Sequence, residues 1–147
     1  MENIIFLPGN VPSSKNSRQS MTIDTKPYYN KNGKLKTYRN VNIPSKLTLA
    51  YKQMIMPYML EARPKWLAMK QGLEGVLKVE FTFIRESRRT FDYINAAQII
   101  QDMMQEMSWI ENDNCNFLKP YFGDFKYDKE NPGVEIRLIK NVTIEYV

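Results

Sequence analysis

Alternating apolar and polar positions predict strands near both ends of the chain and in its middle. The apolar run 3–7 stops at Pro8 and predicts a buried strand that leads into a loop. Residues 76–84 alternate with the period of a half-buried strand, and so do 134–139 and 142–146. We therefore expect a small sheet that contains 3–7, 76–84 and 134–139.

Two stretches follow a helical period instead. The first runs from about residue 45 to 61 after Pro44, and Pro57 is expected to kink or end it. The second covers 92–107, where Asp92 can cap the first turn. Its apolar residues form one stripe that should face the sheet: Ala96, Ile100, Met103, Met104 and Met107.

These elements predict an α+β fold, with a small mixed β-sheet packed against two main helices. The 147 residues are enough for one domain with its own core, and no repeat or linker divides the chain. We expect a single domain over 1–147.

A hairpin is predicted around Asn32-Gly33, a pair suited to the positive backbone angles of a tight turn. Lysines and tyrosines alternate along residues 26–39, and such a surface could contact phosphates and stack on unpaired bases. The alternative is structural, because lysines on an exposed edge strand also prevent aggregation.

The amino-acid composition restricts the catalytic groups and metal ligands that the protein can use. The chain has no histidine, which excludes a His general base, a Ser-His or Cys-His pair and any metal site that needs imidazole. The single Cys115 cannot form an intramolecular disulfide, and no apolar run reaches the roughly 18 residues of a membrane span. These features lead us to expect a cytoplasmic protein without membrane contact.

Charge is distributed unevenly along the chain. Residues 1–90 hold 16 of the 21 Lys and Arg but 6 of the 16 Asp and Glu; residues 91–147 hold the other 5 and 10. A basic half attracts a polyanion, whereas an acidic half could hold a divalent cation against it. An ordinary solvated surface is the alternative.

Three aspartates are candidates for metal chemistry. Asp92 lies where a strand leads into a helix, Asp102 on the polar side of that helix and Asp113 just beyond its end. If the 111–114 turn folds back beside the helix start, two of these carboxylates could share a Mg²⁺ ion, which prefers oxygen ligands. Each also has a structural interpretation, as an N-cap, a solvated helix position and a turn former respectively.

Two segments together resemble the RusA family of Holliday junction resolvases. One is the opening loop 8–17, Pro-Gly-Asn-Val-Pro-Ser-Ser-Lys-Asn-Ser, and the other is 88–95, Arg-Arg-Thr-Phe-Asp-Tyr-Ile-Asn, with the helix to Asp102, Trp109 and the acidic turn at Asp113 after it. The resemblance implies a RusA-like domain, a homodimer and Mg²⁺-dependent cutting of four-way DNA junctions. It also implies Asp92, Asp102 and Asp113 as catalytic residues, and Asp92, Asp113 and Asn95 as metal ligands.

The chain departs from the family pattern at two positions. Ile94 stands where the family has a second aspartate, and Gln98 where it has a lysine. Ile94 cannot bind a metal, and neutral Gln98 cannot stabilise an anionic transition state as an ammonium would. Because three of the four acidic or amide positions are kept, we expect a working Mg²⁺-dependent endonuclease in which Glu111, Asn112 or Asp102 completes the site. The alternative is a catalytically weak or inactive relative that binds branched DNA.

Basic residues are expected to form one continuous DNA-binding surface that leads to the acidic turn. The residues predicted for this surface are Lys15, Arg18, Lys34, Lys36, Arg88 and Arg89.

A protein-interaction domain without a nucleic-acid role is a third functional alternative. Binding that changes little with salt concentration would favour it.

Overall fold

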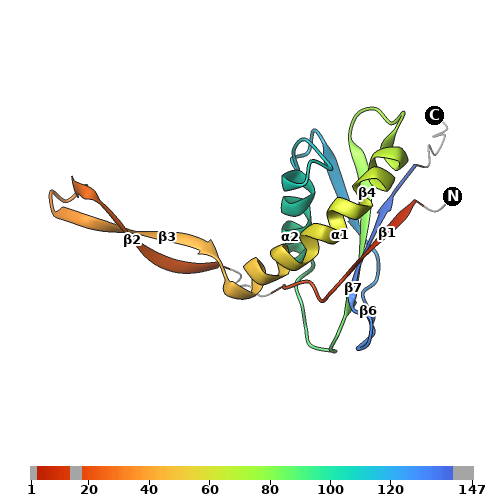
Figure 1. The fold of residues 1–147 in the computed structure, drawn as a ribbon, viewed down its shortest axis with the longest axis horizontal. Coiled ribbons are helices and arrows are strands. Elements are labelled where there is room, and N and C mark those ends of the chain that lie inside the picture. Colours follow the sequence, from red (N-terminus) through yellow and green to blue (C-terminus); the bar gives the residue numbers. More distant parts are fainter. Residues whose placement is uncertain (1–2, 14–17, 141–147) are drawn as a thin grey trace, which may run out of the picture.

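A computed structural model describes residues 3–13 and 18–140 and has an α+β fold (Figure 1). The main sheet has the strand order β1 (Ile4–Pro8), β7 (Gly133–Leu138), β4 (Leu77–Arg85), β5 (Leu118–Phe122). β7 is antiparallel to both of its neighbours, whereas β5 runs parallel to β4. The short β6 (Lys126–Tyr127) continues beside the end of β4. The sheet is therefore mixed, and its three predicted strands are confirmed.

Two helices, α1 (Lys46–Lys70) and α2 (Tyr93–Glu106), pack on the sheet. α2 connects β4 to the parallel strand β5, which makes a β-α-β unit. The apolar stripe of α2 lies in the core as predicted, and Met103 and Met104 are fully buried there. The opposite face of the sheet carries polar pairs, among them Arg137 and Glu80, joined at 3.1 Å.

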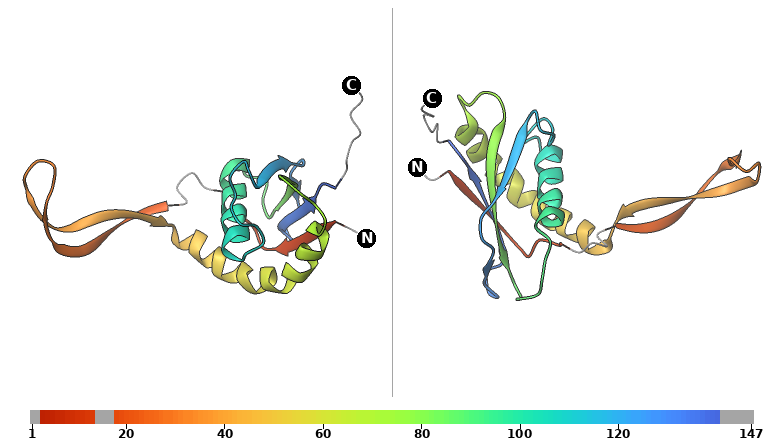
Figure 2. Two further views of the ribbon diagram at one scale, coloured as in Figure 1. Left: turned by 90° about the horizontal axis from the view of Figure 1, so that it is seen from above. Right: turned by 180° about the vertical axis from the view of Figure 1, so that it is seen from behind.

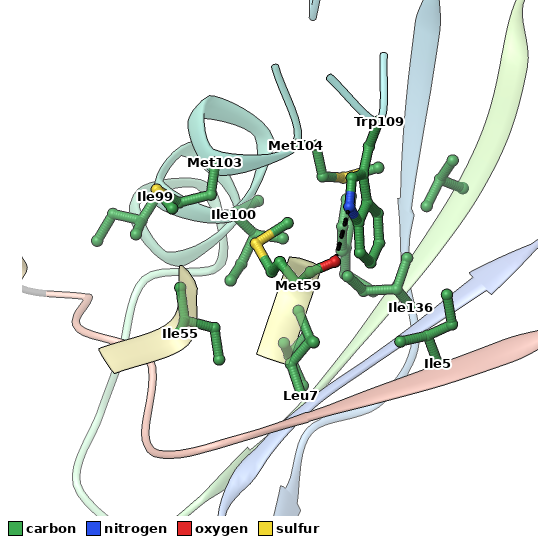
Figure 3. Packing of buried hydrophobic residues seen from close by; sticks show 14 of the residues in the cluster. Ile5, Leu7, Ile55, Met59, Ile99, Ile100, Met103, Met104, Trp109 and Ile136 are labelled. Atoms are coloured by element: carbon green, nitrogen blue, oxygen red, sulfur yellow. Dashed lines mark hydrogen bonds between the residues drawn. The ribbon is translucent and has the colours of Figure 1, made fainter. Parts of the chain in front are cut away.

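Two stacked tryptophans join α1 to the turn after α2. Figure 3 shows Trp109 among the core residues, with its indole N–H directed at Met59. The rings of Trp66 and Trp109 lie 5.3 Å apart and are fully buried. Trp66 Nε1 donates to the carbonyl of Trp109 at 2.8 Å, and Trp109 Nε1 donates to the carbonyl of Met59 at 3.2 Å. Both indole N–H groups therefore have partners, which a buried polar group requires.

α1 is longer than predicted, because it continues through Pro57 and Pro64 to Lys70. A proline inside a helix removes one hydrogen bond and crowds the preceding turn, at a cost of about 3 kcal/mol. Burial of Ile55, Met59 and Trp66 on the inner side offsets that cost. Figure 2 shows α1 bending around the sheet, as expected for a helix that contains prolines.

A long hairpin, which we call the arm, projects from the body (Figure 1). It consists of residues 18–44: β2 (Arg18–Tyr29) and β3 (Leu35–Pro44) pair antiparallel in a sheet of their own. Gly33 at its turn has a φ of 75°, which L-residues with a side chain rarely adopt. The predicted hairpin is thus confirmed, although its strands are much longer than the sequence pattern indicated.

Two strands were not predicted, and one predicted strand lies outside the described residues. β5 and β6 are short and mostly exposed, so they lack the apolar alternation by which a strand is recognised. The expected strand 142–146 falls within 141–147, which the structure does not describe. Among the described helices, none is both long and apolar enough to cross a membrane.

Candidate nucleic-acid interface

An open cleft of about 780 Å³ lies where β4 ends and α2 begins. Its lining comes from the opening loop, the connection after β4, the start of α2, and Leu47 near the start of α1. In sheets with parallel strands, ligands commonly bind beyond the carboxyl ends of the strands, and this cleft has that position beside β4. The two segments that resemble the RusA family therefore meet around one cleft.

Arg85 fastens the opening loop to the end of β4. Its side chain is buried, and the guanidinium donates to the carbonyl of Val11 and, at 3.3 Å, to Ser13 Oγ. The guanidinium carbon also lies 4.6 Å from the centre of the Phe91 ring, a cation–π contact. Burial lowers the pKa of Arg85, and the negative charge of Glu86 opposes this shift. The sequence analysis did not single out Arg85.

Two asparagines strengthen the same junction. The side-chain oxygen of Asn10 accepts a hydrogen bond from the backbone N–H of Glu86 at 3.1 Å. Asn95 Nδ2 donates to the carbonyl of Ser13 at 3.4 Å. Asn95, predicted as a metal ligand, thus holds the opening loop against α2.

Asp92 is the N-cap of α2. Its Oδ1 accepts hydrogen bonds from the backbone N–H groups of Ile94 at 2.9 Å and Asn95 at 3.3 Å. The structural interpretation of Asp92 is therefore confirmed, and the carboxylate also lines the cleft. Ile94 lines the cleft as well and is 71% exposed, so this position presents an apolar side chain and not a metal ligand.

Asp102 contacts α1 and not the cleft. Its carboxylate lies 4.0 Å from Lys52 Nζ, and Glu106, one turn later, lies 3.7 Å from the same ammonium. At 1.5 Å of rise per residue, the ten-residue step from Asp92 to Asp102 corresponds to about 15 Å. Asp102 therefore pairs the two helices and does not complete a site with Asp92.

Asp113 lies at the opposite end of α2 from Asp92, so the expected fold-back of the 111–114 turn is wrong. The 14 residues of α2 span about 21 Å. The chain then enters β5, whose first residue Leu118 pairs with Leu77, the first residue of β4. Because β4 and β5 are parallel, the helix must carry the chain back along the whole sheet. Asp92 and Asp113 of one chain cannot share an ion in this arrangement.

The acidic side chains do not form a dense cluster. Within residues 3–13 and 18–140, no group of three or more Asp, Glu or Cys side chains could hold a metal ion. Two carboxylates, Glu86 and Asp92, do line the cleft. Mg²⁺ is often held by one or two carboxylates, with water and substrate phosphates as its other ligands. The donors at the cleft thus fit a weakly held Mg²⁺ that requires phosphate for full coordination.

The predicted basic residues whose side chains the structure describes lie in two places, the cleft end of the body and the arm. Arg89 is exposed and lines the cleft, and the Arg88 guanidinium lies 4.5 Å from the centre of the Tyr127 ring. Lys34 and Lys36 lie on the arm, away from the body (Figure 1). Arg18 begins β2, but its side chain is not described, and Lys15 lies outside the described residues. The acidic turn adjoins neither group.

Phe91 and Tyr93 of the cleft lining belong to an aromatic cluster that the sequence analysis missed. Phe91 lies 4.8 Å from Tyr93 and 5.3 Å from Phe125, measured between ring centres. Tyr93 Oη accepts a hydrogen bond from the backbone N–H of Phe125 at 3.2 Å. Phe125 remains 49% exposed and Phe122 40%. These residues belong to separate segments, so no local pattern in the sequence indicates the cluster.

No protein-family model matches this chain, and no curated protein matches it significantly in sequence. The likeness to the RusA family therefore depends on the motifs at 8–17 and 88–113.

Proposed function

We propose that this protein binds branched DNA through the cleft and the arm, as a RusA-like protein with weak or no cleavage activity. The observation that carries the proposal is the meeting of the opening loop with the Arg88–Asn95 segment around one cleft. At that cleft Arg89 supplies a positive charge, and Ser13, Ser87 and Thr90 supply hydroxyl groups. Such groups are the usual partners of phosphate oxygens. The separation of Asp92 from Asp113 favours binding over cutting.

Mg²⁺-dependent endonuclease activity is the second candidate, favoured by the presence of Glu86 and Asp92 at the same cleft. These two carboxylates would hold the ion. Bound there, Mg²⁺ would activate a water molecule and neutralise charge on a phosphodiester. Without an ion, both carboxylates would repel the phosphates that Arg89 attracts.

The resemblance further suggests a homodimer. Exposed apolar side chains on α1 support this proposal, among them Leu60, which is 62% exposed. A cytoplasmic location is proposed on the same footing, since the lone Cys115 is exposed and suits a reducing compartment.

Binding and cleavage of a synthetic four-way junction test the two candidates. We expect the purified protein to bind the junction in EDTA, and expect Arg89→Ala to weaken binding at all sequences and to make its dependence on salt less steep. Gln105→Ala, an exposed neutral change on α2, serves as the matched control. Absence of junction binding at moderate salt would contradict the proposal.

Cleavage is then measured with and without Mg²⁺. Little or no cutting supports the binding protein. Cutting that is lost in both Glu86→Gln and Asp92→Asn, but kept in Asp113→Asn, supports the endonuclease with its site at the cleft. If Asp113→Asn also abolished cutting, the active site would have to combine the Asp92 end of one chain with the Asp113 end of another.

A further inference from the structure

The arm has no partner in the described part of the chain other than itself. β2 and β3 pair only with each other, and both views in Figure 2 show the arm extending away from the body. A two-stranded hairpin on its own is marginally stable in water. An arm of this length is therefore expected to act by contact with another molecule.

The charge of the arm indicates what kind of molecule it contacts. Residues 18–44 contain six Lys and Arg but only Asp24 as an acid, and the outer part, 25–37, contains four lysines and no acid. Helix α1, with its exposed apolar side chains, is basic as well, with five Lys and Arg against Glu61. The α1 surface of a second copy would therefore repel the arm, whereas a nucleic acid would attract it.

The two faces of the arm differ near its tip. On one face, Tyr28 Oη donates to the carbonyl of Tyr38 at 3.0 Å, and Lys36 Nζ lies 5.4 Å from the centre of the Tyr38 ring. Tyr28 and Tyr38 are thus engaged within the arm. Successive residues of a strand point to opposite faces, so Tyr29 lies on the other face, directly across from Leu35.

Tyr29 and Leu35 form an apolar end to the arm, 74% and 58% exposed. The turn that carries them is well defined, because Asn30 Oδ1 accepts hydrogen bonds from the backbone N–H groups of Asn32 and Lys34, both at 2.9 Å. Asn30 N–H in turn donates to the carbonyl of Lys34 at 2.9 Å. An exposed aromatic–aliphatic pair on a fixed turn, with lysines on both sides, has the chemistry of a wedge for nucleic-acid bases.

We propose that Tyr29 and Leu35 stack on unpaired bases at a DNA branch point while the lysines of the arm contact the flanking phosphates. This inference rests on the proposed DNA-binding function and adds the element that selects the branched substrate. Insertion into a continuous duplex must first unstack a base step, which opposes binding. At a branch point the bases are more readily unstacked, so the same contact gives a net gain in affinity.

Binding to an immobile four-way junction and to a duplex of the same sequence tests the proposal. Tyr29→Ser should weaken junction binding about tenfold, within the range for loss of one base–aromatic stack, and leave duplex binding unchanged. Tyr29→Phe should keep the preference, since the ring remains. The double change Lys31→Ala and Lys34→Ala should weaken both complexes, because phosphate contacts do not depend on branching. The fluorescence of a 2-aminopurine at the branch point should change on binding of wild type, since its stacking changes, and much less with Tyr29→Ser.

Three results would overturn the inference, and they are distinguishable. If the wild type binds junction and duplex but Tyr29→Ser leaves their affinity ratio unchanged, the wedge is wrong and the DNA-binding proposal stands. If the wild type binds neither DNA, both proposals fail. If Tyr29→Ser instead converts a dimer to a monomer in sedimentation and leaves the affinity ratio unchanged, the arm tip contacts a second copy of the chain.

Discussion

Single residues in this protein have roles that depend on partners distant in sequence. Arg85, Arg88 and Arg89 belong to one basic stretch, yet Arg85 is buried while the other two are exposed. The difference arises because β4 extends to Arg85, which pairs with Tyr127 and turns its side chain toward Val11. The sequence shows that all three residues are basic. Only the fold distinguishes Arg85, which holds the opening loop, from Arg88 and Arg89, which are available to a ligand.

Tyr51 offers a test of burial at the residue scale. Its ring is buried against the opening loop, and its hydroxyl has no hydrogen-bond partner among the described residues. Tyr51→Phe should therefore raise the free energy of unfolding by about 1 kcal/mol at pH 7, measured by urea denaturation. A loss of stability in this variant would show that the hydroxyl has a partner.

The stability of the wild type should also depend on pH through Tyr51. Burial raises the pKa of this phenol above its ordinary value of 10.0. Below pH 10 the phenol is protonated in both states, so it contributes no pH dependence. Above pH 10 the unfolded chain releases the proton while the folded chain retains it, so stability falls as pH rises. Tyr51→Phe should show a shallower alkaline decline; parallel curves would contradict this cause.

At the scale of elements, periodicity predicted most of the helices and strands but not the direction in which neighbouring strands run. The strands at 3–7, 76–84 and 134–139 and the helix at 92–107 have strong patterns, and each is present. β5 was missed, and with it the parallel pairing to β4 that places Asp113 far from Asp92. Whether residues before and after a helix can meet at one metal ion depends on whether the flanking strands are parallel or antiparallel. No local sequence pattern contains that information.

Two substitutions of Asp92 separate its structural role as the N-cap of α2 from the effect of its charge. Asp92→Ala removes the acceptor for two backbone N–H groups and should destabilise the protein by about 1 kcal/mol. Asp92→Asn keeps a capping oxygen and should cost about 0.5 kcal/mol or less, while DNA binding in EDTA tightens because a repelling charge is gone. Urea denaturation and junction titration measure the two effects. Asp113→Asn, at the far end of α2, is the control and should leave both unchanged.

The whole molecule combines two parts held by different forces. The body has a continuous core to which the main sheet and the two helices contribute, and no arm residue in 21–41, where the side chains are described, belongs to it. The arm is held by its own backbone pairing and by contacts such as Thr22 Oγ1 to Asn40 Oδ1 at 2.9 Å. Hydrophobic patterning predicts the first kind of structure well. It predicts the second poorly, because an exposed ribbon has no apolar face buried in the core to set the length of its strands.

Removal of the arm should therefore leave the body folded and change only its interaction with DNA. Arg18 and Pro44 are opposite partners in β2 and β3, so their Cα atoms lie about 5 Å apart, and a short glycine linker can replace 18–44. We expect the Tm of the shortened protein to stay within about 4 °C of wild type, since a change below about 1 kcal/mol corresponds to that shift.

The affinity of the shortened protein for the junction should fall, and its dependence on salt should become less steep. Each phosphate contact contributes about 0.9 to the slope of log K against log salt, so loss of the six Lys and Arg in 18–44 should lower it by up to about 5.4. An unchanged slope would mean that the arm does not contact phosphates, and a large drop in Tm would mean that it supports the core.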